Sequence, residues 1–509
     1  MPINVPAMQP IDHFHRAVRR WPDRIAVIDG ERSFTFAEIS EKAMALAAAL
    51  QDMDPAPQSR VAICAYNTVE HLLAWLAVFA SGKTWVALNP RNGNEELNRI
   101  MDVVEPSIAI IDDDCLDKLD LPKSAVIHGK PAEGVAVDGH RMAELIEANG
   151  GREPARPDLA PDDIQAIKFT GGSSGVPKGV LQTYRVWNTC VATMIDAFDF
   201  DHDDRHLLAA PMTHGANTLI MPIMSRGGAQ VFMGPAKPAA ILDAIETHGV
   251  TSFFIPPTVL YMMMADPGLK NRNLSSLRHL IAGGAAMRPE AVREAMPLFN
   301  NALETCFGQT EAPQIAICMR AADWRDEKNL ASTGRPTFLT RVEIMDTEGN
   351  ILPRGEQGEI VLKGDLVMKG YLDMPEKTAE TIIDGWLHTG DVGVIDDRGF
   401  VFIKDRIRDV VITGGFNVFP SDVEAVLGLH PAVKECVVFG IPDDKWGEAV
   451  HAAVELHDNA DADEKAIIAF VKERLDSVKA PKRVHITDDL PRSPVGKVLR
   501  REAKIRFAA

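Results

Sequence analysis

The chain has 509 residues, too many for one hydrophobic core, and its 46% hydrophobic and 25% charged residues are ordinary for a globular protein. Its formal net charge of −18 argues against a general nucleic-acid-binding protein, which would carry a basic field. Six scattered cysteines without a Cys-x-x-Cys pair favour reduced thiols, so we expect a cytoplasmic protein. The first residues lack a basic start followed by an apolar core, and the most apolar helix-like run, residues 72–80, is short, so we expect no signal peptide and no membrane-spanning segment.

The first part of the chain alternates short apolar strands with helices. A capping box of Thr35 and Glu38 predicts the start of a helix that runs to about Leu50. Further helices are predicted to begin near Val69 and Asn94. The predicted strands occupy residues 24–28, 61–65, 85–88 and 108–111. This alternation predicts a parallel sheet with helices on both faces, whereas the less regular residues 113–165 are interpreted as loops and a sheet edge.

Beyond residue 179 the pattern predicts a second array of strands and helices. Its strands are predicted over residues 207–210, 229–232, 252–255 and 280–282. Short alternating strands with glycine turns then predict a β-rich subdomain at about 341–403, and a compact α+β tail follows. We therefore predict an α/β fold: a large N-terminal domain, residues 1–407, with two βα-layered sheets plus the β-rich subdomain, and a small C-terminal domain, residues 408–509.

The segment from Phe169 to Gly179 holds four glycines, three hydroxyls and one lysine in eleven residues. Glycines let a backbone approach a ligand closely, and a turn of free N–H groups binds anions. Lys178 supplies a point charge suited to phosphate. Pro177 and Gly179 flank this lysine, so the segment is not a Walker A motif. It predicts a polyphosphate-binding loop, with a solvent-exposed connection as the alternative.

Three later segments carry further candidate chemistry. Thr310 beside Glu311 suits Mg²⁺, which takes few protein oxygens together with phosphate and water. An Asp391 carboxylate in a Thr-Gly-Asp turn can accept hydrogen bonds from both hydroxyls of a ribose. Lys497 in a loop can stabilise charge that develops on phosphorus. The alternatives are, in the same order, a capped helix start, a structural turn and a solvated lysine.

Taken together, these motifs resemble, in order, those of the adenylate-forming superfamily, which includes acyl-CoA synthetases, firefly luciferases and peptide-synthetase adenylation domains. The loop is similar to the family's Thr-Ser-Gly-Thr-Thr-Gly-x-Pro-Lys-Gly, with Gly171 in place of the first serine. The segment ending at Glu311 resembles Tyr-Gly-x-Thr-Glu, with Phe307 in the aromatic place. Residues 386–391 match Trp-x-x-Thr-Gly-Asp, and residues 490–500 resemble the C-terminal lysine motif.

The resemblance implies a role for each matching residue. It implies that Lys497, Thr310 and His214 take part in catalysis, with His214 at the border of the carboxylate pocket, and that Glu311 holds Mg²⁺. It makes Arg408 the hinge of a mobile C-terminal domain, although the family commonly has Asp or Lys there. The remaining residues would bind ATP or coenzyme A: Thr170, Gly172, Ser173, Ser174, Gly175, Lys178, Gly284, Ala285, Phe307, Asp391, Arg406, Gly414 and Gly415.

The family resemblance implies an acyl-CoA synthetase that uses ATP, Mg²⁺ and coenzyme A. A carboxylic acid would be converted to an acyl-adenylate and then to a thioester. His214 stands where amino-acid-activating members carry Asp, so we expect a medium-chain fatty or aromatic acid in an apolar pocket. The alternatives are an enzyme that loads a carrier protein, a luciferase-like oxidase and a catalytically silent nucleotide-binding homologue. A homodimer is a family-level expectation.

Overall fold

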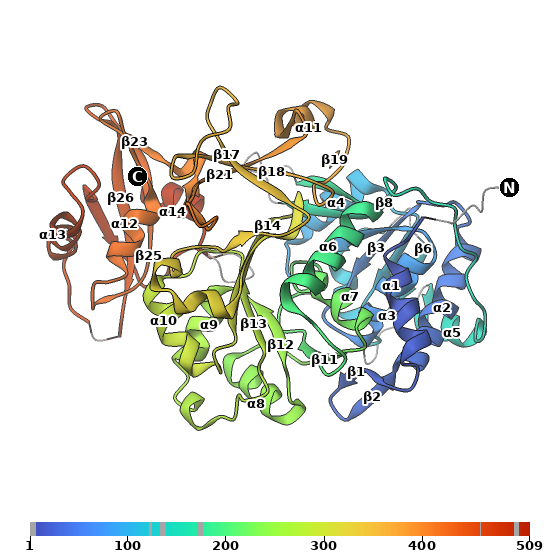
Figure 1. The fold of residues 1–509 in the computed structure, drawn as a ribbon. Coiled ribbons are helices and arrows are strands. Elements are labelled where there is room, and N and C mark those ends of the chain that lie inside the picture. Colours follow the sequence, from blue (N-terminus) through green and yellow to red (C-terminus); the bar gives the residue numbers. More distant parts are fainter. Residues whose placement is uncertain are drawn as a thin grey trace.

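The computed structural model describes residues 7–121, 125–132, 139–170, 177–458, 460–492 and 498–508. Within these residues the strands form four sheets, which confirms the predicted α/β class (Figure 1). Two large sheets with helices make up the bulk of the molecule, the orange β-rich elements lie along the top of the view, and the red C-terminal elements lie to one side. None of the helices in the described ranges is long and apolar enough to cross a membrane.

The eight-stranded sheet is parallel at its centre, as predicted. Its spatial order is β19 (Gly370–Tyr371), β9 (Lys178–Thr183), β8 (Ile164–Thr170), β4 (Thr84–Leu88), β3 (Arg60–Cys64), β5 (Ile108–Ile111), β6 (Ala125–His128) and β7 (His140–Arg141). Its helices are α2 (Phe36–Met53), α3 (Val69–Ala80), α4 (Asn94–Val104), α5 (Met142–Ala148) and α6 (Tyr184–Phe198), with the 3₁₀ helix η1 (Asp113–Lys118). The Thr35–Glu38 capping box is present. Helix α5 was not predicted within residues 113–165.

The nine-stranded sheet contains one strand that the sequence pattern had grouped with the first array. Its order is β16 (Arg335–Pro336), β15 (Ala312–Met319), β14 (Leu303–Gln309), β13 (His279–Gly283), β12 (Ser252–Ile255), β10 (Arg205–Leu207), β11 (Ala229–Phe232), β1 (Ile25–Asp29) and β2 (Arg32–Thr35). Strand β1 pairs in parallel with β11, Val27 opposite Gln230, although about 200 residues separate them. The associated helices are α1 (Ile11–Arg20), α7 (Asn217–Ser225), α8 (Pro238–His248), α9 (Pro257–Met264), α10 (Pro289–Leu298), η2 (Leu269–Asn271), η3 (Ala321–Arg325) and η4 (Glu327–Asn329).

Two five-stranded sheets follow, and the chain passes from one to the other through residues 407–410. The third sheet has β17 (Arg341–Met345), β18 (Gln357–Lys363), β20 (Ile382–Ile383), β21 (Trp386–Ile395) and β22 (Val401–Arg406), with helix α11 (Pro375–Thr381). The fourth has β23 (Val411–Thr413), β24 (Phe416–Val418), β25 (Val433–Asp443), β26 (Gly447–Leu456) and β27 (Arg483–Ile486), with α12 (Pro420–Leu427), α13 (Glu464–Arg474) and α14 (Arg500–Phe507). The short η5 (Ile407–Asp409) connects them.

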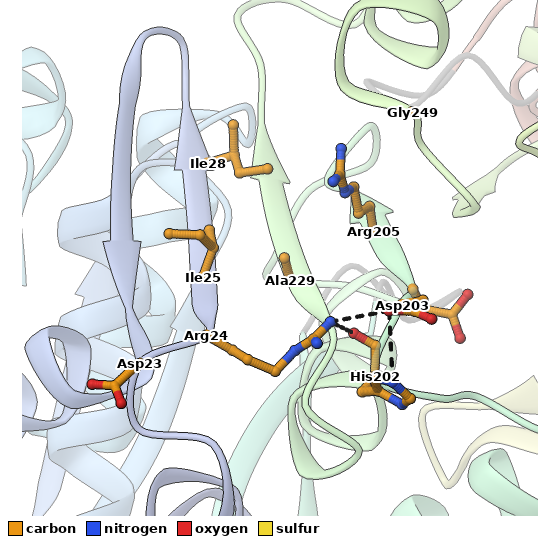
Figure 2. A pocket seen from close by; sticks show the side chains of 10 residues that line it. Asp23, Arg24, Ile25, Ile28, His202, Asp203, Arg205, Ala229 and Gly249 are labelled. Carbon is orange, nitrogen blue, oxygen red and sulfur yellow. Dashed lines mark hydrogen bonds and ion pairs between the residues drawn. The ribbon is translucent and has the colours of Figure 1, made fainter.

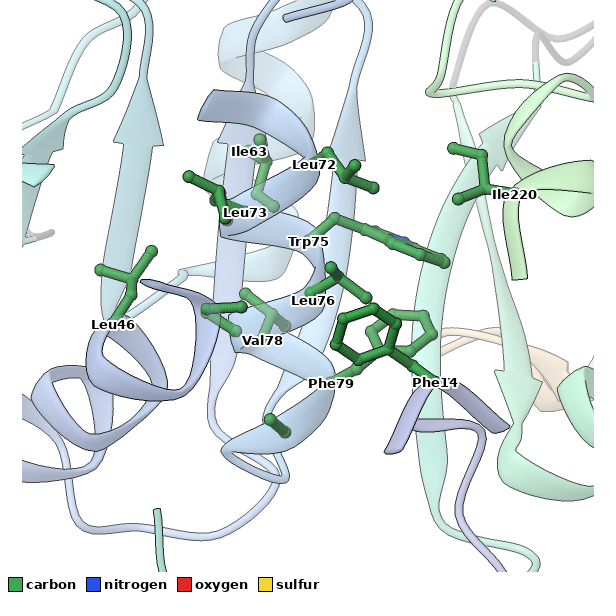
Figure 3. Close-up of a cluster of buried hydrophobic side chains, with 14 of the residues drawn as sticks. Phe14, Leu46, Ile63, Leu72, Leu73, Trp75, Leu76, Val78, Phe79 and Ile220 are labelled. Carbon is green, nitrogen blue, oxygen red and sulfur yellow. The ribbon is translucent and has the colours of Figure 1, made fainter. Parts of the chain in front are cut away.

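The first core is built around helix α3, which is buried on all sides. Figure 3 shows Trp75 and Phe79 of this helix packed with Phe14 and Leu76. The rings of Trp75 and Trp187 lie 6.0 Å apart, so α6 packs on the same cluster. Because burial of each large aromatic side chain contributes about 2–3 kcal/mol, this cluster anchors the strands β4 and β8 beneath it.

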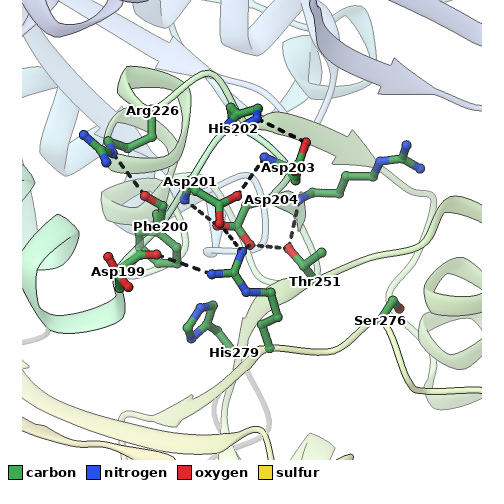
Figure 4. Close-up of polar contacts among 12 residues, drawn as sticks. Asp199, Phe200, Asp201, His202, Asp203, Asp204, Arg226, Thr251, Ser276 and His279 are labelled. Carbon is green, nitrogen blue, oxygen red and sulfur yellow. Dashed lines mark hydrogen bonds and ion pairs between the residues drawn. The ribbon is translucent and has the colours of Figure 1, made fainter.

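A cavity of about 680 Å³ opens at the amino ends of β1, β10 and β11 (Figure 2). His202 and Asp203 of its lining, with neighbouring Asp201, are close enough to share a metal ion. However, Arg24 already pairs with Asp203 at 3.1 Å (Figure 2), and Arg278 pairs with Asp201 at 2.8 Å. Figure 4 shows Asp201, His202 and Asp203 with their polar neighbours. These ion pairs occupy the two carboxylates, and the cavity lies at the opposite strand ends from the predicted nucleotide site.

Candidate active site

The stems of the predicted phosphate loop are two antiparallel strands of the first sheet. Thr170 ends β8 and lies opposite Lys178, which begins β9. The Thr170 hydroxyl is buried and has no hydrogen-bond partner among the described residues. Gly172, Ser173, Ser174 and Gly175 lie outside the described residues. The described stems therefore bring a lysine and a buried hydroxyl to the same end of the hairpin.

Lys178 belongs to a cluster with Glu311 and a tyrosine that sequence reasoning did not single out. The Tyr371 hydroxyl donates a hydrogen bond of 2.8 Å to Glu311 Oε1. Lys178 Nζ lies 3.3 Å from the same hydroxyl and 4.6 Å from the centre of the tyrosine ring. Burial lowers the pKa of Lys178, and Glu311 opposes that change. Tyr371 arrives through the two-residue strand β19, which pairs with β9, and no local sequence signal marks it.

A second cluster joins Asp391 and Arg406, the two expected ribose contacts, to Gln309. Asp391 and Arg406 lie opposite each other on β21 and β22, and Arg406 Nε forms an ion pair with Asp391 Oδ1 at 2.6 Å. Gln309 Nε2 donates to Asp391 Oδ2 at 2.7 Å and to the Thr389 carbonyl at 2.9 Å. Gln309 was missed as a site residue, although it lies inside a predicted motif. It ties the third sheet to the end of β14.

The segment from Glu304 to Glu311 is a strand and a tight turn, so the alternative of a capped helix start is wrong. Half-buried Phe307 lies near the end of β14 and packs in the third core cluster. At Gly308 a Cβ atom would come within 2.5 Å of the Gln314 backbone, so only glycine fits there. The Thr310 carbonyl accepts a hydrogen bond of 2.8 Å from Gln182 of β9. This contact holds the Thr310–Glu311 turn against the stem that carries Lys178.

Small residues gather near the predicted carboxylate pocket. A Cβ at Gly283 would come within 2.8 Å of the Phe254 ring, and one at Gly215 within 2.7 Å of Gln314 Oε1. Gly284 has φ +88°, which allows the exposed turn at Gly284 and Ala285. These glycines let strands β12, β13 and β15 meet the 211–217 segment closely.

His214 keeps exposed surface but is electrically neutral near pH 7. Its Nδ1 lies 2.9 Å from the Thr213 hydroxyl. The surrounding protein desolvates the ring and, with Lys168 and Arg91, lowers the pKa of His214 to about 4. A neutral imidazole can orient a carboxylate through a hydrogen bond but supplies no positive charge.

Lys168 is a buried lysine that sequence reasoning overlooked. It lies two residues before Thr170, and its Nζ donates to Asn217 Oδ1 at 2.8 Å. Its Nζ also lies 5.1 Å from the Trp85 ring and 5.3 Å from the Trp187 ring. Burial lowers the pKa of Lys168 to about 7. Only the packing of α3 and α6 over β8 reveals this site.

The C-terminal candidates that the structure describes lie in the η5 connection and in the β23–β24 turn. Arg408 lies in η5 with its side chain 65% exposed. Gly414 and Gly415 form the β23–β24 turn with φ +58° and +82°, and both are exposed. Three exposed apolar side chains lie around that turn: Ile412, Phe416 and Trp446. Lys497 lies outside the described residues, between Arg492 and Val498, which pair with each other.

Comparisons with known proteins cover nearly the whole chain. The family model described as AMP-binding enzyme matches residues 14–372, and the model of the AMP-binding enzyme C-terminal domain matches residues 422–497. A medium/long-chain-fatty-acid–CoA ligase, FadD8, of Mycobacterium tuberculosis is 33% identical, over 96% of this chain and 89% of that ligase. A feruloyl-CoA synthase of an Amycolatopsis species is 34% identical, over 97% and 98%. The structure of the amide bond synthetase McbA from Marinactinospora thermotolerans has a TM-score of 0.88 at 29% identity, over 98% and 100%.

Proposed function

This chain belongs to the AMP-binding enzyme family and is an AMP-forming acid–thiol ligase, and we propose that it converts a medium-chain fatty or aromatic acid to its coenzyme A thioester. The observation that carries the proposal is the convergence of Lys178, Glu311, Asp391 and Arg406 into two clusters linked by the β14 turn. These residues come from three sheets. One ATP molecule offers its phosphates to Lys178, a phosphate-bound Mg²⁺ to Glu311, and its ribose to Asp391 and Arg406.

In the proposed first step, an oxygen of the substrate carboxylate attacks the α-phosphorus of ATP and pyrophosphate leaves. The loop beside Lys178 binds the departing phosphates, and Lys178 lowers their negative charge. Asp391, held by Gln309 and Arg406, positions the ribose. Lys497 stabilises the charge that develops on the α-phosphate. The product is an acyl-adenylate, whose AMP is a better leaving group than the oxygen of a free carboxylate.

Glu311 and Thr310 fit a magnesium ion bound with the phosphates. A carboxylate beside a hydroxyl matches the preference of Mg²⁺ for a few protein oxygens together with phosphate and water. Tyr371 holds one oxygen of the Glu311 carboxylate, which fixes its orientation. When bound, the ion would neutralise phosphate charge during adenylate formation.

In the proposed second step, the thiol sulfur of coenzyme A attacks the acyl carbon and AMP leaves. We assign the thiol channel to the Gly414–Gly415 turn, and we place the domain boundary at residues 407 and 408. The exposed Ile412, Phe416 and Trp446 around this turn support an acceptor-binding role, because clustered apolar side chains on a surface mark a binding face.

The choice of acid rests on the carboxylate pocket. Gly215 and Gly283 let the Phe254 ring pack closely against the 211–217 segment, which gives the pocket an apolar wall, and neutral His214 offers no partner for a substrate ammonium. This combination supports an apolar acid rather than an amino acid. The names of the two relatives, which refer to fatty and feruloyl substrates, support the same class.

ATP–pyrophosphate exchange measured across a panel of fatty, aromatic and amino acids tests this function. We expect exchange that depends on a medium-chain or aromatic acid and on Mg²⁺. Thioester formation is then compared with free coenzyme A and with a phosphopantetheinylated carrier protein. Faster transfer to the carrier would favour the carrier-loading alternative, and absence of exchange with every acid would favour a silent nucleotide-binding homologue.

A further inference from the structure

Asp405 is held from both sides by parts of the chain that follow the η5 connection. It lies next to the end of β22, and its side chain is only 4% exposed. Its Oδ2 accepts a hydrogen bond of 2.8 Å from the Ser421 backbone N–H at the start of α12. Its Oδ1 accepts one of 3.0 Å from Arg500 Nη1 at the start of α14. One carboxylate of the third sheet therefore binds two helices of the fourth.

The other partners of Arg500 lie beyond Arg408. Arg500 Nη1 also donates to Asp409 at 2.9 Å, and its Nη2 donates to both oxygens of Glu424 at 2.9 and 3.0 Å. If the chain turns at Arg408, these two acids move with Arg500, whereas Asp405 does not. When Asp405 moves away, Arg500 therefore stays paired with two carboxylates. Breaking the Asp405–Arg500 contact thus costs less free energy than leaving the buried Arg500 charge without any partner.

The two proposed steps require the C-terminal sheet to take two orientations. The Gly414–Gly415 turn lies at the start of β26, where Thr413 pairs with Gly447. Arg492, which flanks the Lys497 segment, bonds to Glu455 near the end of the same strand, at 2.9 Å. Eight residues of strand separate Gly447 from Glu455, about 27 Å at 3.4 Å per residue. A rigid unit cannot bring both ends of this strand to one reacting carboxyl group.

We infer that Asp405 is a clasp that holds the C-terminal sheet in the orientation seen here and thereby sets the balance between the two steps. In this orientation the Gly414–Gly415 turn is exposed, so the thiol step requires the clasp to open. The Asp405 hydrogen bonds to Ser421 and Arg500 then break, together with the bonds from the Ser421 hydroxyl to the Lys404 carbonyl and from Arg288 to the Gly428 carbonyl. This inference rests on the proposed two-step function.

Asp405→Asn tests the clasp, with Asp409→Asn as the matched control. Both changes remove one carboxylate from Arg500 Nη1 at nearly the same distance, 3.0 and 2.9 Å, but only Asp405 precedes the connection. Spin labels on exposed positions, at Glu290→Cys of α10 and Lys472→Cys of α13, report the orientation without any substrate. We expect one narrow distance distribution in the wild type and the control, and a second population in Asp405→Asn.

The kinetic measurement compares thioester formation from preformed adenylate with ATP–pyrophosphate exchange in the same preparation. We expect Asp405→Asn to raise this ratio about tenfold, the size of a typical coupling between two states, and Asp409→Asn to leave it unchanged. Because both rates come from one sample, a partly unfolded fraction lowers them equally and does not change their ratio. Asp405→Ser, whose hydroxyl can still accept the Arg406 N–H, replaces Asp405→Asn if that variant is insoluble.

Two results would overturn the clasp: equal ratios in the two variants, or a single unchanged distance distribution in Asp405→Asn. Failure of the proposed function has a different signature, because the wild type would then show no acid-dependent exchange. The label distances would still report whether Asp405 fixes the orientation.

Discussion

Replacing Lys168 with Met should stabilise the protein near pH 7 and lose that advantage in alkali. The folded protein lowers the pKa of Lys168 from its ordinary value of 10.5 to about 7. Each pKa unit corresponds to about 1.4 kcal/mol, so burial of the charged form costs the folded state at most about 5 kcal/mol. Contacts with the Trp85 and Trp187 ring faces return part of this cost, about 0.5–2 kcal/mol each. We therefore expect Lys168→Met to gain about 1–4 kcal/mol at pH 7.

The pH dependence follows from the proton balance. Between pH 7 and about pH 10.4 the unfolded chain keeps the Lys168 proton whereas the folded chain has released it, so wild-type stability rises with pH. The advantage of Lys168→Met should shrink over the same interval. Below pH 7 both states are protonated, and the advantage is constant.

Urea unfolding followed by tryptophan fluorescence at pH 7, 8.5 and 10 measures this effect, because Trp75, Trp85 and Trp187 surround the site. Lys270→Met makes the same chemical change at an exposed lysine and should alter stability by less than about 0.5 kcal/mol. Two results would refute the reasoning: a Lys168→Met variant that is less stable than the wild type at pH 7, or one whose stability advantage over the wild type is as large at pH 10 as at pH 7.

Three further predictions concern the site and acid stability. Lys497→Ala should nearly abolish ATP–pyrophosphate exchange but leave thioester formation from preformed adenylate largely intact; equal loss in both assays would contradict its assigned role. Asp391→Asn weakens the charged pair with Arg406 and should raise the KM for ATP about 10- to 100-fold in exchange assays, with an unchanged KM counting against a ribose contact. Burial lowers the pKa of His13, His71 and His206 to about 4, so between pH 6.5 and 4 the unfolded chain binds more protons than the folded chain. The urea midpoint of unfolding should therefore fall over that interval, and each histidine should cost up to about 3 kcal/mol of stability. A midpoint that does not change with pH would contradict the neutral state of these buried histidines.

Local chemistry allowed the sequence to identify many elements and motif positions. The Thr35–Glu38 capping box is present as predicted, because a cap depends on residues three apart. Asp391 and Arg406 were both identified from motifs, and the structure places them opposite each other on neighbouring strands. By contrast, β1 was grouped with the nearest strands along the chain, yet it joins β11. Sheet partners depend on burial of distant faces, which local periodicity does not encode.

The sequence by itself determined the α/β class, the order of the family motifs and the residue types that we propose to meet ATP, because these depend on side-chain chemistry and short spacings. Only the tertiary structure decided which distant side chains complete each cluster. Tyr371 reaches Glu311 through a two-residue strand, Lys168 meets the rings of Trp85 on β4 and Trp187 on α6, and Asp405 meets Arg500 across 95 residues. Each contact joins residues far apart in sequence, so it exists only once the sheets have packed.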